Sequence, residues 1–198
     1  MKVYQTNEIK NIALLGNDGS GKTTLTESLL YEAGSIQRRG RITQKNTVSD
    51  YFPVEQEYGY SVFSTVYNVE WNNKKLNIID CPGSDDFVGA ALTALNVTDT
   101  AVLLINGQYG PEVGTQNHFR YTEKLKKPVI FLVNQLDAEK CDFNNSLDRL
   151  KEIYGSWVFD YAPVKKIVLP GAQNPFTGRS GLSSDDVTLY VHPDLVEA

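Results

Sequence analysis

Short apolar runs alternate along this chain with segments in which apolar residues recur every three or four positions. Four runs are nearly continuous, as in buried parallel strands: Ile12–Leu15, Leu76–Asp80, Ala101–Asn106 and Val129–Asn134. Four segments have helical spacing: Lys22–Glu32, Phe87–Asn96, Thr115–Leu125 and Ser146–Tyr154. This alternation predicts an α/β fold with a doubly wound, mostly parallel sheet, which binds ligands beyond the carboxyl ends of its strands.

The remaining segments have weaker patterns. Val62–Trp71 alternates between two faces and predicts one antiparallel edge strand, which turns at two asparagines into the strand at Leu76. Further short strands are expected at Lys166–Leu169 and Val187–Val191. Residues 34–60 show little periodicity, and loops of that length are usually functional or disordered. Residues 170–184 are rich in Gly, Ser, Asn and Pro and are typical of a loop or linker.

The first predicted strand leads into a glycine-rich turn that opens the first predicted helix. Its sequence fits the pattern G-x-x-x-x-G-K-T of the phosphate-binding P-loop, and this context is what the motif requires. Backbone N–H groups and the helix N-terminus attract phosphate, Lys22 reaches the β- and γ-phosphates, and the Thr23 hydroxyl can ligate Mg²⁺. The residues expected to bind nucleotide here are Asn17, Asp18, Gly19, Ser20, Gly21, Lys22, Thr23 and Thr24.

Two further motifs follow predicted strands and indicate which nucleotide is bound. In the D-x-x-G turn that begins at Asp80, the carboxylate is expected to hold Mg²⁺ through water, and the Gly83 N–H to sense the γ-phosphate. The second motif lies at the end of the strand Val129–Asn134 and consists of Asn134, Gln135 and Asp137. A carboxylate such as Asp137 can accept the N1–H and N2–H₂ donors of guanine, which adenine lacks. The motifs therefore predict GTP or GDP with Mg²⁺.

Composition restricts the kinds of molecule that the chain is expected to bind. The 198 residues carry a formal net charge of −5, which argues against nucleic-acid binding through bulk electrostatics. The basic stretch Arg38–Arg41, with Lys45 nearby, is equally compatible with a solvated loop and with an anion or RNA contact. No apolar run approaches a membrane span. Two cysteines and two histidines are isolated and lack metal-ligand spacing: Cys81, Cys141, His118 and His192. We expect a cytoplasmic monomer that binds neither membranes nor specific DNA sequences.

From Ile9 to Asp137 the three motifs, in their order and spacing, resemble the GTP-binding domain of translational GTPases, and most closely that of elongation factor G. The stretches that carry the resemblance most specifically are Gln56-Glu57-x-Gly59 and Pro82-Gly83-x-x-Asp86-Phe87. The resemblance implies a P-loop fold of the G-domain type and a GTP switch that docks on the ribosome and assists translocation or a related step. It also implies a GTP-binding domain over residues 1–161, the start of an inserted subdomain or linker over 162–198, and a fragment of a larger multidomain protein.

The chain departs from the family where the attacking water is positioned. Ser84 stands where the family has a histidine, and a serine hydroxyl is too short to reach the same place. Groups of this kind contribute about 10²–10⁴-fold in rate. Hydrolysis is therefore predicted to be slow or absent.

Three other departures affect ligand contacts. The family's Arg-Gly-Ile-Thr of the first switch is Tyr-Gly-Tyr-Ser here, so Ser61 can still offer Mg²⁺ a hydroxyl. Gln135 replaces a lysine whose stem lies along the base, which weakens base packing by roughly 1–2 kcal/mol. Gly19 replaces an aspartate, so a bound monovalent cation is in question. The family's last nucleotide motif is not identified, and the residue that completes the guanine pocket remains open.

Three alternatives stay open. The chain could be an active ribosome-stimulated GTPase in which Asp85 or Asp86 positions the water. It could be a regulatory or resistance factor that occupies the ribosome without promoting translocation. It could also be an unrelated P-loop ATPase or kinase, which Asp137 disfavours.

Overall fold

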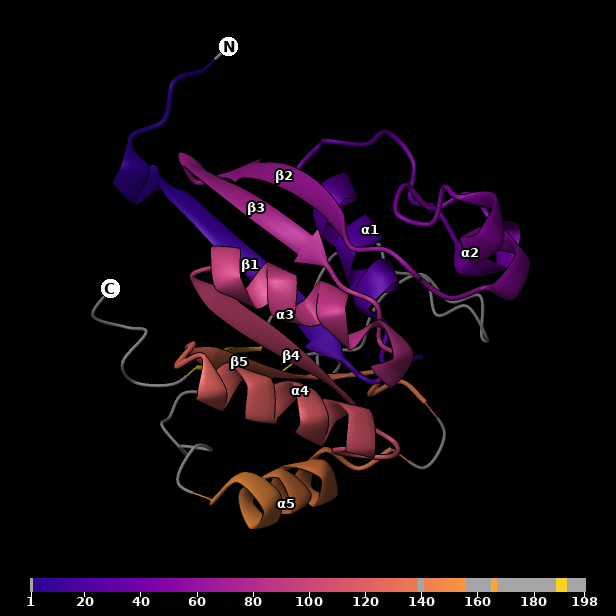
Figure 1. Ribbon diagram of the computed structural model, residues 1–198, viewed down its shortest axis with the longest axis vertical. Helices are drawn as coiled ribbons and strands as arrows, with labels where there is room; N and C mark the ends of the chain where they lie inside the picture. Colours follow the sequence, from indigo (N-terminus) through magenta and orange to yellow (C-terminus); the bar gives the residue numbers. More distant parts are fainter. Residues whose placement is uncertain (1, 139–140, 156–164, 167–187, 192–198) are drawn as a thin grey trace.

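A mixed β-sheet lies at the centre of the computed structural model, which describes residues 2–138, 141–155, 165–166 and 188–191. Within these residues the strands run in the order β2-β3-β1-β4-β5-β7-β6 (Figure 1). Their bounds are β1 Ile9–Gly16, β2 Thr65–Trp71, β3 Lys74–Asp80, β4 Thr100–Asn106, β5 Val129–Asn134, β6 Lys165–Lys166 and β7 Thr188–Val191.

Strand direction confirms the predicted sheet. The central strands β3, β1, β4 and β5 are parallel, and β2 forms an antiparallel edge against β3. The turn between β2 and β3 places Asn72 and Asn73 at φ +46° and +61°, a conformation that asparagine tolerates well in tight hairpins. At the other edge the strand expected over Val187–Val191 is present as β7. It is antiparallel to β5 and to β6, so the sheet has more antiparallel pairing than the single edge strand we expected. Of the strand expected over Lys166–Leu169, the part after Lys166 lies outside the described residues, as does the expected linker 170–184.

The helices of the described residues are α1 Lys22–Glu32, α2 Pro53–Tyr58, α3 Val88–Val97, α4 Val113–Lys124 and α5 Phe143–Tyr154. The four predicted helices are confirmed with small shifts at their ends. The largest shift is at α5, which begins at Phe143 because the Asp142 carboxylate accepts the backbone N–H groups of Asn144 and Asn145. None of these helices is long and apolar enough to cross a membrane.

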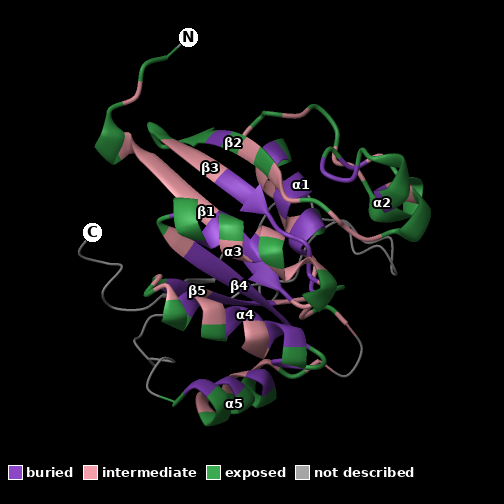
Figure 2. Cartoon of the chain, in the orientation of Figure 1, coloured by how far each residue is buried: buried purple, intermediate pink, exposed green. Residues whose placement is uncertain are grey.

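Helices cover both faces of the sheet, as in a doubly wound fold. Helix α1 packs on one face, where its Leu30 meets Leu14 and Leu104, whereas α3, α4 and α5 cover the other (Figure 1). Neighbouring residues of β4 alternate between the two cores, so that Leu103 contacts one and Leu104 the other. Burial rises toward the carboxyl ends of β1 and β3, from which the P-loop and the D-x-x-G turn depart (Figure 2). The two motifs therefore start from the most buried ends of these strands.

The segment 34–60 holds more structure than its sequence indicated. It contains a 3-10 turn at Ile42–Gln44 and the short helix α2, most of which is exposed (Figure 2). Two buried carboxylates accept backbone hydrogen bonds from this segment and from the residues after it. Glu27 of α1 accepts the N–H groups of Gly40 and Val48 at 2.6 and 2.5 Å, and Glu55 accepts those of residues 62 and 63 at 3.0 Å. These contacts join distant parts of the chain, so no local periodicity could reveal them.

Candidate nucleotide-binding site

The P-loop wraps the N-terminus of α1 between β1 and the end of β5. Gly21 lies at φ +93°, and a Cβ there would collide with the side-chain amide of Asn134, so both conformation and space require glycine. The Asp18 carboxylate accepts the Gly19 N–H at 2.9 Å and holds the preceding turn. Contacts within the chain thus hold the loop, and the helix N-terminus lies behind it.

Lys22 lies inside the loop. Its side chain is 6% exposed, and its Nζ donates to the carbonyl oxygens of Gly16 and Asn17 at 3.0 and 2.9 Å. Burial lowers the pKa of Lys22, against the opposing effect of the Asp80 and Asp18 carboxylates. The ammonium group is therefore held at the concave side of the loop, where phosphate oxygens would need a cation.

The D-x-x-G turn packs directly against the P-loop. A Cβ on Gly83 would lie 2.5 Å from the Lys22 Nζ and 2.7 Å from the Asp18 nitrogen. A larger residue would push the turn away from the loop. Glycine thus lets the backbone of residue 83 approach the position expected for the γ-phosphate.

Oxygen ligands converge beside Thr23. The Thr23 Oγ1 donates to Asp80 Oδ2 at 3.1 Å and lies 3.4 Å from the Ser61 Oγ, which in turn donates to Asp50 Oδ1 at 2.8 Å. The other oxygen of Asp80, Oδ1, is buried and finds no hydrogen-bond partner among the described residues. Burial raises the pKa of Asp80 to about 7, although Lys22 opposes the shift.

This arrangement fits Mg²⁺. Hydroxyl and carboxylate oxygens are the ligands it prefers, and a divalent cation would compensate the buried oxygen of Asp80. The predicted ligands Thr23, Ser61 and Asp80 are thus brought together. Asp50, which we did not predict as a site residue, supports them through Ser61. The site combines carboxylates with hydroxyls, and nowhere in the described part of the chain do three or more His, Cys, Asp or Glu side chains form a group that could hold a metal ion.

The motif after β5 is tied to the P-loop. The Asn134 Nδ2 donates to the Ser20 carbonyl at 2.9 Å, and the Gln135 Nε2 donates to the Gly19 carbonyl at 2.8 Å. Gln135 Oε1 also accepts from the Asn106 Nδ2 at 2.6 Å. Gln135 therefore fastens the base-side loop to the phosphate-side loop, a role that the sequence alone did not reveal. Asp137 is exposed in the turn that follows.

Ser84 is used for local structure. Its Oγ accepts the backbone N–H of Asp86 at 3.3 Å and caps the 3-10 turn Asp85–Phe87. The Asp85 carboxylate accepts from the Asn117 side chain of α4 at 3.1 Å, and Asp86 is exposed. None of these three side chains lines the nucleotide cavity described below.

A cavity of about 170 Å³ brings most of the predicted residues together. Asp18, Gly19, Gly21, Lys22, Thr23, Thr24, Ser61, Gly83 and Gln135 line it, together with Ile42, Asp50, Gly59 and Tyr60. Among the predicted residues, Asn17, Ser20, Asp80 and Asn134 do not line it. The Asn17 carbonyl accepts from Lys22, Asp80 accepts from Thr23, and Asn134 donates to the Ser20 carbonyl within the P-loop. Asp137 and Ser84 are not among the lining residues. Ile42 was not predicted as a site residue. The only feature that marks it in the sequence is that it is an isolated apolar residue in a polar stretch.

His118 of α4 is a buried polar residue near this site. It is 1% exposed, and neither ring nitrogen has a hydrogen-bond partner among the described residues. Burial lowers the pKa of His118 to about 4, and the charge of Lys22 acts in the same direction. His118 is therefore packed inside the domain as a neutral ring near neutral pH.

The depressed pKa predicts acid sensitivity. The folded-state pKa of His118 lies below the ordinary histidine value of 6.5, so the unfolded chain takes up a proton more readily than the folded protein. The free energy of unfolding is therefore unaffected by this group above pH 6.5 and decreases as the pH falls toward 4. At about pH 5 the loss is about 2 kcal/mol. The free energy of unfolding, measured with denaturant, should fall less between neutral pH and about pH 5 in the variant His118→Leu than in the unmodified protein. Equal differences for the two proteins would contradict this prediction.

The chain is similar to known proteins over most of its length. Residues 7–197 match the family described as the elongation factor Tu GTP-binding domain. An elongation factor G-like protein of Thermotoga maritima is 34% identical over 86% of this chain and 23% of its own length. The tetracycline resistance protein TetP of Clostridium perfringens is 37% identical over 73% of this chain and 22% of its own length.

A solved structure gives the same result in three dimensions. A crystal structure of a protein from Thermus thermophilus matches 75% of this chain and 22% of its own chain, with a TM-score of 0.73 and 35% sequence identity. The chain thus spans about a quarter of the length of the relatives it matches. It belongs to the elongation factor Tu GTP-binding domain family, as an elongation factor G-like GTP-binding domain of the translational GTPases.

Proposed function

We propose that this domain binds GTP and GDP with Mg²⁺ and is the nucleotide switch of a ribosome-associated translation factor that hydrolyses GTP slowly or not at all. The P-loop N–H groups and Lys22 would bind the phosphates, and the Gly83 N–H would contact the γ-phosphate. Thr23, Ser61 and Asp80 would hold Mg²⁺, which when bound neutralises charge on the β- and γ-phosphates. Asp137 would select guanine.

The observation that carries the proposal on hydrolysis is the position of the Ser84 hydroxyl. It caps the turn Asp85–Phe87 and points its acceptor at the Asp86 N–H. One of its lone pairs is therefore used locally, and a neutral hydroxyl is a poor base, so it is a weak substitute for a group that positions and deprotonates a water at the γ-phosphate. Loss of such a group raises the barrier by roughly 3–5 kcal/mol.

Steady-state GTP turnover by the full-length protein on ribosomes tests this proposal. We expect turnover well below that of an ordinary elongation factor G measured alongside it. Comparable turnover would favour the active GTPase instead, although Asp85 is already bonded to Asn117. Preference for ATP in binding would favour the unrelated ATPase.

A second candidate rests on one of the relatives. The match to a tetracycline resistance protein has an identity similar to that of the elongation factor G-like match. A factor that occupies the ribosome without promoting translocation would use the same nucleotide site. A ribosome-binding assay paired with a translocation assay separates the two, because a switch that assists translocation should promote it, whereas this second candidate should bind without promoting it.

Other parts of the proposal concern the whole protein. Docking on the ribosome, a cytoplasmic location, a monomeric state and the absence of sequence-specific DNA binding all remain predictions. So does the division into a GTP-binding domain at 1–161 and an inserted subdomain or linker from 162.

A further inference from the structure

Asn106 is the last residue of β4 and does not line the nucleotide cavity. It is 7% exposed, and in the sheet register it lies beside Asn134 on β5. Its side-chain amide forms hydrogen bonds at both ends. Oδ1 accepts the backbone N–H groups of Gln108 and Tyr109 at 2.9 and 3.2 Å, and Nδ2 donates to the Gln135 Oε1 at 2.6 Å. Asn106 therefore joins the loop after β4 to Gln135.

Gln135 continues this chain of hydrogen bonds to the P-loop. Its Oε1 accepts from Asn106, and its Nε2 donates to the Gly19 carbonyl at 2.8 Å. The two side-chain amides of Asn106 and Gln135 thus form an amide relay. It runs from backbone N–H groups in the loop after β4 to a backbone carbonyl of the P-loop.

The backbone groups at the two ends fix the direction of the amide relay. An N–H group can only donate, and a carbonyl oxygen can only accept. The Oδ1 of Asn106 must therefore face the N–H groups, which leaves its Nδ2 for Gln135, and the Nε2 of Gln135 must face Gly19. Turning either amide over would set two donors or two acceptors against each other.

The amide relay holds the turn that carries Asp137. Gln135 lies at φ +60°, a conformation that residues other than glycine adopt infrequently. Its carbonyl accepts the Ala138 N–H at 3.1 Å, which closes the turn around Asp137. The position of the Asp137 carboxylate therefore depends on where Gln135 is held.

We propose that Asn106 is a positioning residue for guanine recognition. It holds Gln135, and through Gln135 the turn of Asp137, at a fixed place relative to the P-loop. The inference rests on the proposed guanine-nucleotide site. Within that site it assigns the preference for guanine over adenine, in part, to a buried residue outside the nucleotide cavity.

Asn106→Asp in the full-length protein tests the amide relay. Binding of fluorescent GTP and ATP would be measured with Mg²⁺ at about pH 8, so that the introduced carboxyl is ionised. This carboxylate has the shape of the asparagine amide and still accepts the two backbone N–H groups, but it has no donor for Gln135. GTP should bind at least about tenfold more weakly. The affinity for ATP should change less than about threefold, because adenine lacks the donors that Asp137 would accept.

Gln135→Lys supplies the rescue. An ammonium group can donate both to the carboxylate introduced by Asn106→Asp and to the Gly19 carbonyl, so it restores a donor at each junction. Asn106→Asp should therefore weaken GTP binding in the unmodified protein but not in the Gln135→Lys background. The two effects should differ by at least about tenfold in this double-mutant cycle. If Asn106 only capped the loop after β4, the effect would be equal in both backgrounds.

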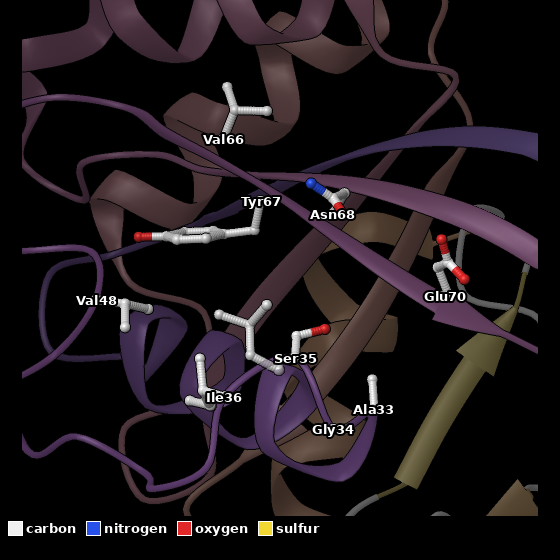
Figure 3. A pocket seen from close by; sticks show the side chains of 10 residues that line it. Ala33, Gly34, Ser35, Ile36, Val48, Val66, Tyr67, Asn68 and Glu70 are labelled. Carbon is white, nitrogen blue, oxygen red and sulfur yellow. The ribbon is translucent and has the colours of Figure 1, made fainter. Parts of the chain in front are cut away.

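Asn68→Asp is the matched control, because it makes the same change of charge at an exposed position of β2. Asn68 lines a separate cavity of about 540 Å³, near Tyr67 and Glu70 (Figure 3). That cavity shares no lining residue with the nucleotide cavity. Asn68→Asp should bind GTP and ATP as the unmodified protein does.

Gln135→Met keeps the test decisive if Asn106→Asp does not fold. Gln135 is less buried than Asn106, and methionine keeps the length of the side chain while removing its amide donor and acceptor. It should weaken GTP binding at least about tenfold and change ATP binding less. Circular dichroism and thermal unfolding show which variants are folded.

Three results would overturn this inference and leave the proposed function standing. They are GTP binding unchanged in folded Asn106→Asp or in Gln135→Met, equal weakening by Asn106→Asp in both backgrounds, and equal weakening of GTP and ATP. Failure of the unmodified full-length protein to bind guanine nucleotides would instead overturn the proposed function, and this inference with it.

Discussion

Replacing Ser84 by histidine in the full-length protein should raise ribosome-stimulated GTP turnover by at least about tenfold. The imidazole is long enough to reach beyond the turn toward the γ-phosphate, where the serine hydroxyl is held by its cap on Asp86. The expected gain is below the usual range for proton-handling groups, because the surroundings of residue 84 have not been shaped for histidine. Initial rates of phosphate release with and without ribosomes measure it.

The control is Ser84→Ala, which removes the cap but adds no proton-handling group. Its turnover should equal that of the unmodified protein, and its stability should fall by about 1 kcal/mol because the N–H of Asp86 loses its partner. If Ser84→His folds, binds GTP and leaves turnover unchanged, residue 84 is not the missing element. Another group would then position the water.

Lys22→Ala should weaken GTP binding by about 100-fold, which corresponds to about 3 kcal/mol. The variant removes the ammonium group at the concave side of the P-loop, and charge-assisted bonds to phosphate contribute about 1.5–3 kcal/mol each. Titration with a fluorescent GTP analogue in the presence of Mg²⁺ gives the change in Kd.

Lys124→Ala, at an exposed position on α4, is the matched control, because it also removes one positive charge. It should leave the affinity for GTP unchanged. Equal affinities for Lys22→Ala and the unmodified protein would mean that the P-loop does not hold the phosphates.

The sheet and the P-loop could be predicted because their signals are local. A buried parallel strand is a continuous apolar run, so β4 and β5 were found within one residue of their ends. The glycines and Lys22 occupy fixed places between a strand and a helix, and that order is visible in the sequence. By contrast, α2 is a single short helix that begins at Pro53, too short to show a helical period.

Several contacts of the site could not be predicted, because they join residues far apart in the chain. Asp50 supports the proposed Mg²⁺ ligands through Ser61, and Ile42 closes one side of the cavity. Gln135 was expected to lie at the guanine base, with weaker packing than a lysine, and its bond to the Gly19 carbonyl was not foreseen. Ser84 was identified by its place in the family's motif, and its capping bond depends on a backbone turn that the pattern did not specify.

The central claim is that this chain is a guanine-nucleotide switch, and equilibrium binding tests it most directly. Fluorescent GTP, GDP and ATP would be titrated with Mg²⁺ into this chain and into the full-length protein. The account predicts saturable binding of GTP and GDP by the full-length protein. ATP should bind at least about 100-fold more weakly, because adenine lacks the N1–H and N2–H₂ donors that the Asp137 carboxylate would accept. Binding of ATP as tight as that of GTP, or no binding of any nucleotide, would contradict it.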